Sequence, residues 1–280
     1  MREAMITKGA ALKLANGVEL PQVGLGVYKL GDKTVASIHA ALAAGYRSID
    51  TATRYQNEDL VGEAVRTCGL PRGDVFVTTK VWNDAQREHR QRQAFEDSLR
   101  VLDIEYIDMY MVHWAIEGCY TETWKILEKL YEEKLVRAIG VCNFEIRHLK
   151  ELEKHAGIMP MVNQIEIHPK NTRKDLIRYC QERGIVCEAW APLGSGTVLE
   201  EHVLKELADK YGKTPAQVIL RWDLQNGLAV IPRSSNPVRI AQNIDLYDFE
   251  LSEEDMARID ALNENWINPL SGGDPNNVTF

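Results

Sequence analysis

An alternation of short apolar runs with amphipathic segments, repeated eight times, is the feature that most constrains this chain. Each apolar run is typical of a strand, and each amphipathic segment has the 3.6-residue period of a helix. Helices inserted between consecutive strands imply that those strands pair in parallel. Eight such units within 280 residues predict an α/β fold, a single (β/α)8 TIM barrel.

A hairpin and two further helices complete the predicted architecture. The hairpin spans Ala10–Pro21 around Asn16-Gly17, a strong turn signal, and we expect it to cap the bottom of the barrel. We expect one domain over residues 1–280, with an irregular tail over 263–280. The expected strands are, in order, Val23–Gly26, Arg47–Asp50, Val75–Lys80, Ile107–His113, Ala138–Cys142, Val162–Ile167, Val186–Trp190 and Ala229–Ile231. The helices that follow them are, in the same order, Lys33–Ala44, Asn57–Arg66, Glu88–Leu102, Thr121–Glu133, Ile146–His155, Arg173–Arg183, Pro215–Gln225 and Val238–Ile244. The two extra helices are Glu200–Tyr211 and Ser252–Leu262.

The competing α/β design is an open dinucleotide-binding sheet. Its fingerprint, G-x-G-x-x-G after the first strand, is matched here only by Gly24 and Gly26, because Lys29 stands where the third glycine belongs. We therefore reject this design.

Charge and cysteine content narrow the functional classes. A net charge of −8 argues against a nucleic-acid partner, because such proteins carry a basic face. No apolar run approaches the ~20 residues of a membrane span, and the start lacks the apolar core of a signal peptide. We expect a cytoplasmic protein with no membrane partner.

The five scattered cysteines form no Cys-x-x-Cys pair, which indicates reduced thiols and no zinc site.

Polar side chains stand at the carboxyl ends of several predicted strands, where barrel enzymes place their catalytic groups. In the segment Gly45–Gly62, Asp50 closes a strand and Tyr55 follows in the loop, while Lys80 and His113 end the next two strands. A phenol is a poor acid at neutral pH unless a nearby cation stabilises its anion. A tyrosine beside a lysine that an aspartate keeps charged can act as a proton donor. Tyr55 is therefore suited to protonate an oxygen that gains negative charge.

Hydride transfer is the natural complement to that proton, and the sequence offers groups for a nicotinamide. Trp190 is a flat aromatic at a strand end that can stack on the ring, and Asn143 with Gln164 can bond its carboxamide.

A local basic cluster suits a phosphate in this acidic protein. Arg233, Ser234 and Arg239 surround the predicted amino terminus of a helix. Arginine forks match phosphate oxygens, and a helix amino terminus adds backbone donors.

Three segments that contain several of these candidate residues give the chain its resemblance to the aldo-keto reductases. Gly45–Gly62 is similar to the first signature of that family, Ala138–Phe144 to the second and Ile231–Asn243 to the third. The likeness runs from the hairpin to about Leu262. Within the family, the chain is most similar to short bacterial and protist members, which include diketogluconate, glyoxal and methylglyoxal reductases and prostaglandin F synthases.

The resemblance implies NADPH-dependent reduction of aldehydes and ketones without metal. Tyr55 would be the general acid, Lys80 would lower its pKa, Asp50 would hold Lys80, and His113 would orient the substrate oxygen. The implied cofactor-binding residues are Cys142, Asn143, Gln164 and Trp190 at the nicotinamide, Leu193 and Ser195 at the pyrophosphate, Arg233, Ser234 and Arg239 at the 2′-phosphate, and Gln242 and Asn243 at the adenine.

Four residues depart from the family pattern. Cys142 replaces the usual serine, which weakens or removes one hydrogen bond to the carboxamide. Arg233 stands where lysine is commoner, and Ala115 where proline is usual. Tyr28 replaces a tryptophan or phenylalanine and adds a hydroxyl near the substrate.

Aromatic residues define the expected substrate site. Tyr28, Trp82 and Trp114, together with the short loop Ile116–Thr121 and the tail after Trp266, would line it. We call this aromatic-lined entrance to the site the mouth. It suits small aldehydes, α-dicarbonyls or keto-sugars held by apolar contact. We expect a monomer whose only partner is a small carbonyl substrate.

Two other functional classes remain open at this point. A cofactor-binding or lens-type structural protein of the same family would not need Tyr55 and Lys80 together. A barrel hydrolase with Asp50 and Glu166 as paired carboxylates would depend on metal or turn over glycosides.

Overall fold

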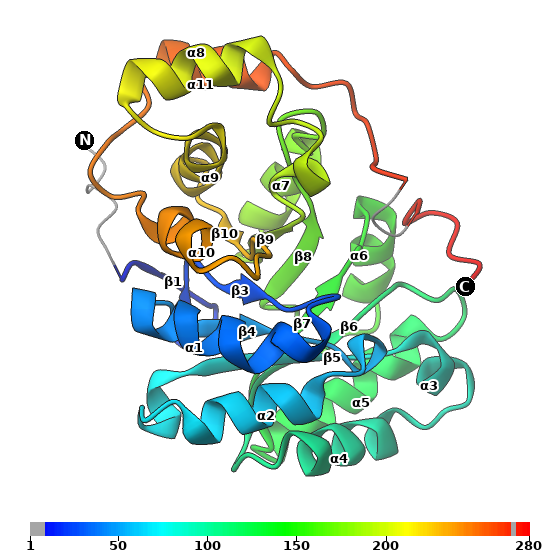
Figure 1. Cartoon of the computed structure of the whole chain (residues 1–280). Helices are drawn as coiled ribbons and strands as arrows, with labels where there is room; N and C mark the ends of the chain where they lie inside the picture. The colour runs from blue at the N-terminus through cyan, green and yellow to red at the C-terminus, as the bar shows by residue number, and fades with distance from the viewer. Residues whose placement is uncertain (1–8, 270–272) are drawn as a thin grey trace.

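Eight parallel strands curl into a closed barrel with helices around it (Figure 1). The computed structural model describes residues 9–269 and 273–280. In the strand order β3-β4-β5-β6-β7-β8-β9-β10, all neighbours pair in parallel. A parallel bridge between Val23 and Val230 joins the first strand to the last. The predicted barrel is confirmed.

The elements agree with the predicted ranges to within a few residues. The barrel strands are β3 (Leu25–Gly26), β4 (Ser48–Asp50), β5 (Phe76–Val81), β6 (Ile107–Val112), β7 (Val136–Cys142), β8 (Val162–Glu166), β9 (Val186–Trp190) and β10 (Ala229–Val230). The helices are α1 (Thr34–Ala44), α2 (Glu58–Thr67), α3 (Asn83–Arg87), α4 (Gln91–Leu102), α5 (Tyr120–Glu132), α6 (Ile146–Glu153), α7 (Lys174–Gln181), α8 (His202–Tyr211), α9 (Pro215–Gln225), α10 (Pro237–Ile244) and α11 (Glu253–Asp260). The two extra helices, α8 and α11, lie together beyond α9 (Figure 1).

One predicted helix is wrong in its boundaries. We expected a helix over Glu88–Leu102, but the structure has the short α3 followed by α4. His89 between them has a φ of 53°, a left-handed conformation that a helix cannot contain. The chain therefore turns at this residue before α4 begins.

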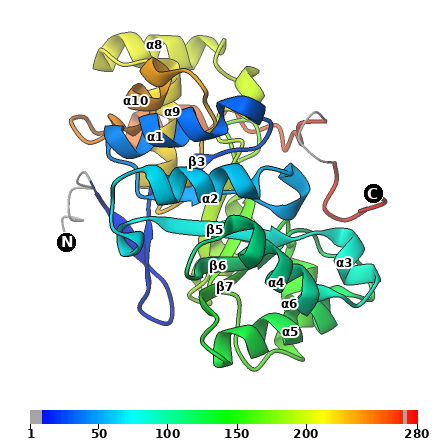
Figure 2. The same cartoon turned by 60° about the horizontal axis from the view of Figure 1, so that its bottom comes forward.

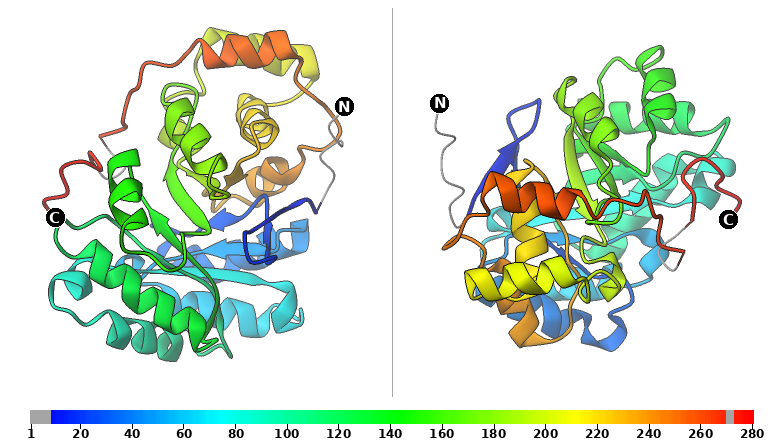
Figure 3. Two further views of the ribbon diagram at one scale, coloured as in Figure 1. Left: turned by 180° about the vertical axis from the view of Figure 1, so that it is seen from behind. Right: turned by 90° about the horizontal axis from the view of Figure 1, so that it is seen from above.

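The hairpin lies at the end of the barrel where the strands begin. Strands β1 (Ala11–Lys13) and β2 (Glu19–Pro21) pair antiparallel, and the Asn16 side chain donates a hydrogen bond to the carbonyl oxygen of Arg137 at 2.9 Å. The hairpin and the C-terminal segment lie on opposite sides of the molecule (Figures 2 and 3). The hairpin is thus held against the barrel as the sequence predicts.

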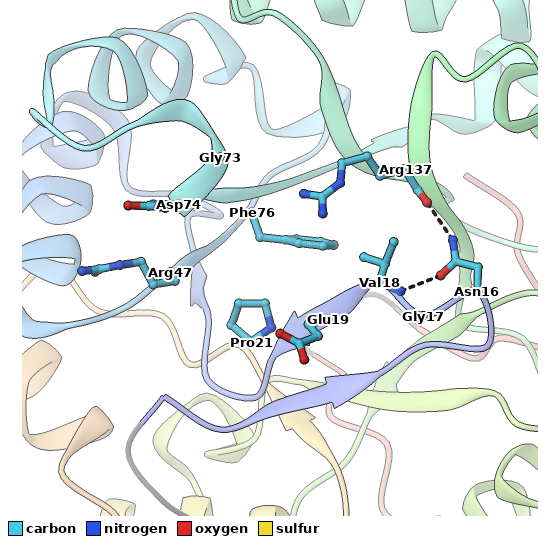
Figure 4. A pocket seen from close by; sticks show the side chains of 10 residues that line it. All are labelled: Asn16, Gly17, Val18, Glu19, Pro21, Arg47, Gly73, Asp74, Phe76 and Arg137. Atoms are coloured by element: carbon cyan, nitrogen blue, oxygen red, sulfur yellow. Dashed lines mark hydrogen bonds between the residues drawn. The ribbon is translucent and has the colours of Figure 1, made fainter.

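A cavity of about 530 Å³ opens between the hairpin and the strand starts (Figure 4). Phe76 at the start of β5 and Arg137 near the start of β7 line it together with Val18 of the hairpin. Because the catalytic groups of barrel enzymes sit at the carboxyl ends of the strands, this cavity is at the wrong end for them.

Gly62 shows why the first signature segment ends on a glycine. A Cβ atom at this position of α2 would lie 1.7 Å from the carbonyl oxygen of Leu102, which ends α4. The Arg66 side chain donates to the same oxygen at 2.7 Å. Helices α2 and α4 therefore approach each other at a distance that only glycine allows.

The tail is irregular over its described parts, 263–269 and 273–280, as predicted, while 270–272 lie outside the described residues. No helix among the described residues is long and apolar enough to cross a membrane.

Candidate active site

Four polar residues meet at the carboxyl ends of neighbouring strands. Asp50 is the last residue of β4, Lys80 is near the end of β5, and His113 directly follows β6. Tyr55 lies in the 3-10 turn Thr53–Tyr55 that follows β4. Parallel pairing places these strand ends at one edge, so residues distant in sequence become neighbours.

Lys80 and Asp50 form a fully buried ion pair. The Lys80 Nζ atom donates to both Asp50 carboxylate oxygens at 2.6 Å and to the Thr51 carbonyl oxygen at 2.9 Å. Burial is the largest influence and lowers the pKa of Lys80, but the charge and hydrogen bond of Asp50, together with Tyr55 and Cys142, outweigh burial, so the net shift is upward. Lys80 is therefore held as an ammonium ion, as the sequence predicts for a lysine beside an aspartate.

Tyr55 contacts this ion pair through its ring. The Lys80 Nζ atom lies 5.3 Å from the centre of the Tyr55 ring. Burial raises the pKa of the Tyr55 phenol, while the Lys80 charge lowers it, and burial is the larger of the two. The lysine acts in the expected direction, but in the protein alone the phenol keeps its proton, which is the state that a general acid requires.

His113 stands beside Tyr55 as a neutral imidazole. Its ring centre lies 5.7 Å from that of Tyr55 and 5.0 Å from that of Trp82, both edge-on. Burial, and then the charges of Lys80 and Arg54, lower the pKa of His113 well below its usual range. A neutral imidazole can donate one hydrogen bond to a substrate oxygen without competing for its proton.

Asn143 and Trp190 form the next part of the site, at the ends of β7 and β9. The indole nitrogen of Trp190 donates to Asn143 Oδ1 at 2.9 Å, and Asn143 Nδ2 donates to the His113 carbonyl oxygen at 3.0 Å. Asn143 has a φ of 61°, and Ala191, which follows Trp190, has a φ of 46°. Such left-handed conformations in residues other than glycine gather at functional sites.

Gln164 of β8 links the two halves of the site. Its Nε2 atom donates to Asp50 Oδ2 at 2.8 Å and to Glu188 Oε2 at 2.7 Å. Its Oε1 atom lies 3.8 Å from the sulfur of Cys142. Because both Nε2 protons face carboxylates, the other end of this amide is a hydrogen-bond acceptor, whose described partner is the weak Cys142 thiol donor.

Glu188 was missed by the sequence analysis. It is 2% exposed in β9 and stands two residues before Trp190. Side chains two residues apart in a strand share one face, so a glutamate in phase with Trp190 was the available signal.

The basic cluster lies at the start of α10. Among described residues, the guanidinium groups of Arg233 and Arg239 have no hydrogen-bond or ion-pair partner, and both residues are exposed. Asn236 caps the helix by accepting from the backbone nitrogens of Val238 at 2.9 Å and Arg239 at 3.2 Å. These donors are already used, so the guanidiniums are the main groups available to a phosphate.

The remaining predicted cofactor residues flank this cluster. Leu193 and Ser195 belong to the turn after β9, where Ser195 has a φ of 56°. Gln242 and Asn243 lie in the last turns of α10.

Aromatic rings pack against Tyr55 and His113. Tyr28 packs on Tyr55 with ring centres 4.8 Å apart, and Phe280 of the tail lies 6.0 Å from Trp82 and 5.2 Å from Trp114. The first of the Phe280 contacts is stacked and the second edge-on. The predicted aromatic mouth therefore includes a ring from the tail.

Two polar side chains of the α3 region hold Phe280 in place. Asn83 Nδ2 and Arg87 Nη2 donate to the carbonyl oxygen of Phe280 at 3.1 Å and 2.8 Å. The sequence analysis named the tail but none of these three residues, because nothing local to α3 indicates a contact nearly 200 residues away.

The two carboxylates of the hydrolase alternative are each bound by other groups. Asp50 is bound by Lys80 and Gln164, whereas Glu166 lies 3.3 Å from His168 and accepts from the backbone of Asn268 at 3.2 Å. The described residues contain no group of three His, Cys, Asp or Glu side chains that could hold a metal ion.

Comparison with known proteins decides between the remaining classes. The model of the aldo/keto reductase family matches residues 22–264. The chain belongs to this family. Glyoxal reductase of Bacillus subtilis (strain 168) is 51% identical over 255 residues, which cover 90% of this chain and 92% of that protein. Methylglyoxal reductase DkgA of Salmonella typhimurium is 45% identical over 258 residues, covering 90% and 93%.

Solved structures of the family agree. An aldo-keto reductase of Bombyx mori in complex with NADP is 34% identical, with a TM-score of 0.87 over 93% of this chain and 95% of that chain. The protein is therefore an oxidoreductase, and the predicted family, fold and enzyme class are confirmed.

Proposed function

We propose that this aldo/keto reductase reduces small aldehydes and α-dicarbonyls to alcohols with NADPH, with Tyr55 as general acid. The observation that carries the proposal is the contact of the Tyr55 ring with the buried Lys80–Asp50 pair, with neutral His113 alongside. A structural or purely cofactor-binding protein has no use for a protonated phenol beside a buried ammonium ion. The curated relatives named for reduction of glyoxal and methylglyoxal support the same reading.

The proton follows a short path in this proposal. NADPH, when bound, supplies the hydride that the carbonyl carbon gains. Tyr55 gives its proton to the carbonyl oxygen, which becomes the hydroxyl of the product. The phenolate left behind is stabilised by the Lys80 ammonium, which Asp50 keeps charged, and it regains a proton from water. His113 donates a hydrogen bond that holds the carbonyl oxygen near Tyr55.

The free polar groups fit NADPH. The acceptor Oε1 of Gln164 suits the amide N–H of a carboxamide, and Trp190, tied to Asn143, offers a fixed indole ring. The guanidiniums of Arg233 and Arg239, which have no described partner, suit a 2′-phosphate. We assign Leu193, Ser195 and Ser234 to the phosphates and Gln242 with Asn243 to the adenine by their places after β9 and in α10.

The size of the mouth favours a small substrate. Trp82 and Trp114 both contact the Phe280 ring, Trp82 also lies edge-on against His113, and Tyr28 packs on Tyr55. These walls offer apolar contact, and the Phe280 ring lies against both tryptophans, so we expect a two- or three-carbon dicarbonyl to fit better than a bulky ketone.

We further propose that the chain works as a single-domain monomer in the cytoplasm. The barrel closes within a single chain, through the bridge between Val23 and Val230.

The test is the initial rate of NADPH oxidation, followed by absorbance, with glyoxal, methylglyoxal and an aromatic aldehyde, and then the same with NADH. We expect turnover of the dicarbonyls, faster with NADPH than with NADH. Tight NADPH binding without turnover of any of the three would instead favour a cofactor-binding role. Sedimentation of the purified protein tests the monomer.

A further inference from the structure

A chain of hydrogen bonds crosses the barrel interior from the catalytic side to the cofactor side. It runs from Lys80 on β5 to Asp50 on β4, to Gln164 on β8 and to Glu188 on β9. Every link is 2.8 Å or shorter, and all four residues are at most 2% exposed. This network has two carboxylates and one ammonium ion.

We propose that Glu188 is a positioning residue of the cofactor site, which orients the Gln164 amide and places a negative charge that favours the oxidised nicotinamide over the reduced one. The inference rests on the proposed NADPH site and deepens it. No other described side chain accepts the second Nε2 proton of Gln164. Without that acceptor the amide could rotate and offer a donor where the carboxamide needs an acceptor.

The preference for the oxidised nicotinamide follows from the charges of the Glu188 carboxylate and of the two ring forms. The oxidised nicotinamide ring carries a positive charge, and the reduced ring is neutral. Trp190, the proposed stacking partner, lies two residues from Glu188 on the same face of β9. A buried carboxylate so close to the ring site favours the charged ring, because a site shielded from water screens the charge weakly.

Titration of Glu188 should make this effect depend on pH. Burial, and then the charge of Asp50, raise the pKa of Glu188 to about 7, against the lowering effects of Gln164 and Lys80. The charged or titratable groups that face it are Asp50 on β4, Lys80 on β5 and Cys142 on β7. Lys80 stays charged, and burial raises the pKa of the Cys142 thiol well above its usual value. Glu188 is therefore the group that changes charge near neutrality.

The experiment measures dissociation constants of NADP⁺ and NADPH for the full chain between pH 5.5 and 8.5, by quenching of protein fluorescence. Their ratio is the informative quantity, because both forms share the adenine, the phosphates and the carboxamide. A purely structural role would change both constants together. Protonation of the 2′-phosphate likewise cancels in the ratio.

Glu188→Gln keeps the shape and an acceptor oxygen but removes the charge. We expect it to weaken NADP⁺ relative to NADPH by about tenfold at pH 8 and to flatten the pH dependence of the ratio. In the unaltered protein the preference for NADP⁺ should grow as the pH rises through about 7, because Glu188 ionises there. Glu188→Asp keeps the charge but shortens the reach to Gln164, so it should weaken both forms while preserving the pH dependence.

The matched control is Glu128→Gln, because Glu128 is also buried but accepts from the backbone of Gly157 and Ile158 under α5. Its ratio should equal that of the unaltered protein. An unchanged ratio in a folded Glu188→Gln variant would overturn the role of Glu188 and leave the cofactor site standing. Failure of the unaltered protein to bind either nucleotide would overturn the cofactor site and this inference with it.

Discussion

The ammonium group of Lys80 lies 2.6 Å from each carboxylate oxygen of Asp50, inside a barrel layer that water does not reach. Two opposite charges are thereby fixed before any ligand arrives. The ring of Tyr55 lies beside this pair, with its centre 5.3 Å from the Lys80 Nζ atom. The consequences for stability and for catalysis can be measured separately.

Lys80→Met should strongly destabilise the fold, because it leaves the Asp50 carboxylate buried without its counter-ion. We expect a loss of about 3–5 kcal/mol in the free energy of unfolding, measured with urea. Adding Asp50→Asn should restore part of this loss. The control Lys205→Met, in an exposed pair with Glu200, should cost less than 1 kcal/mol. Equal effects of the two lysine variants would contradict the structural importance of the buried pair.

Tyr55→Phe should reduce kcat by about 10²- to 10⁴-fold with methylglyoxal, since it removes the proton donor. The dissociation constant of NADPH should change little, because the proposed cofactor residues do not include the phenol. Tyr28→Phe is the matched control, since Tyr28 packs on Tyr55 and also carries a phenol but has no proposed part in proton transfer. Comparable losses in both variants would remove Tyr55 from its proposed role.

Arg239→Ala should raise the dissociation constant of NADPH by about 10- to 100-fold and leave that of NADH nearly unchanged, because only NADPH carries the 2′-phosphate. The measurement is a fluorescence titration with each nucleotide at low and high salt. Arg100→Ala, whose side chain is exposed on α4, is the control. A parallel loss for both nucleotides would place Arg239 elsewhere in the site.

Phe280→Ala should widen the mouth, since its ring contacts both Trp82 and Trp114. We expect kcat/KM for an aromatic aldehyde to rise several-fold relative to that for methylglyoxal. Val101→Ala, at an exposed position on α4, should leave this ratio unchanged. If Phe280→Ala left it unchanged too, the tail ring would not limit substrate size.

His148 should contribute to loss of stability in acid. Its Nδ1 atom accepts from the Glu145 backbone at 3.0 Å, and burial, with Arg147, lowers the pKa of His148 from 6.5 to about 4. A lowered pKa means that the folded protein binds fewer protons, so this contribution is complete above pH 6.5 and is lost as the pH falls to about 4. His148→Gln should remove up to about 3 kcal/mol of this pH dependence.

The stability of His148→Gln is best compared with that of the unaltered protein by urea unfolding at several pH values from 7.5 to 4. His113 contributes with the same sign, so only the difference between the two proteins reports on His148. His202→Gln, at a nearly fully exposed side chain, should reproduce the unaltered pH dependence.

The sequence predicts the barrel well because each strand and helix has its own local signal. The periodicity of Val186–Trp190 and Pro215–Gln225 located both elements to the residue. The sequence did not predict the short α3 as a separate helix. The chain turns at His89 in a left-handed conformation, and no glycine in the sequence indicates that conformation there.

The site was predictable only where a motif carries it. Asp50, Tyr55 and Lys80 stand in segments with strong signals, and the structure places them in contact. The bond of Glu188 to Gln164 and the contact of Arg87 with Phe280 were missed, because both depend on which strand or helix lies opposite in space. Such partners follow from the tertiary arrangement rather than from neighbours in the sequence.

The bridge between Val23 and Val230 has a consequence for how the protein is made. During synthesis, Asp50, Lys80 and His113 leave the ribosome long before β10, the strand that closes the barrel. Until Val230 has been translated, the nascent chain exposes the open edges of its first and latest strands, and such edges invite pairing with other polypeptides. The interval before closure is thus when the nascent chain is most exposed to incorrect strand pairing.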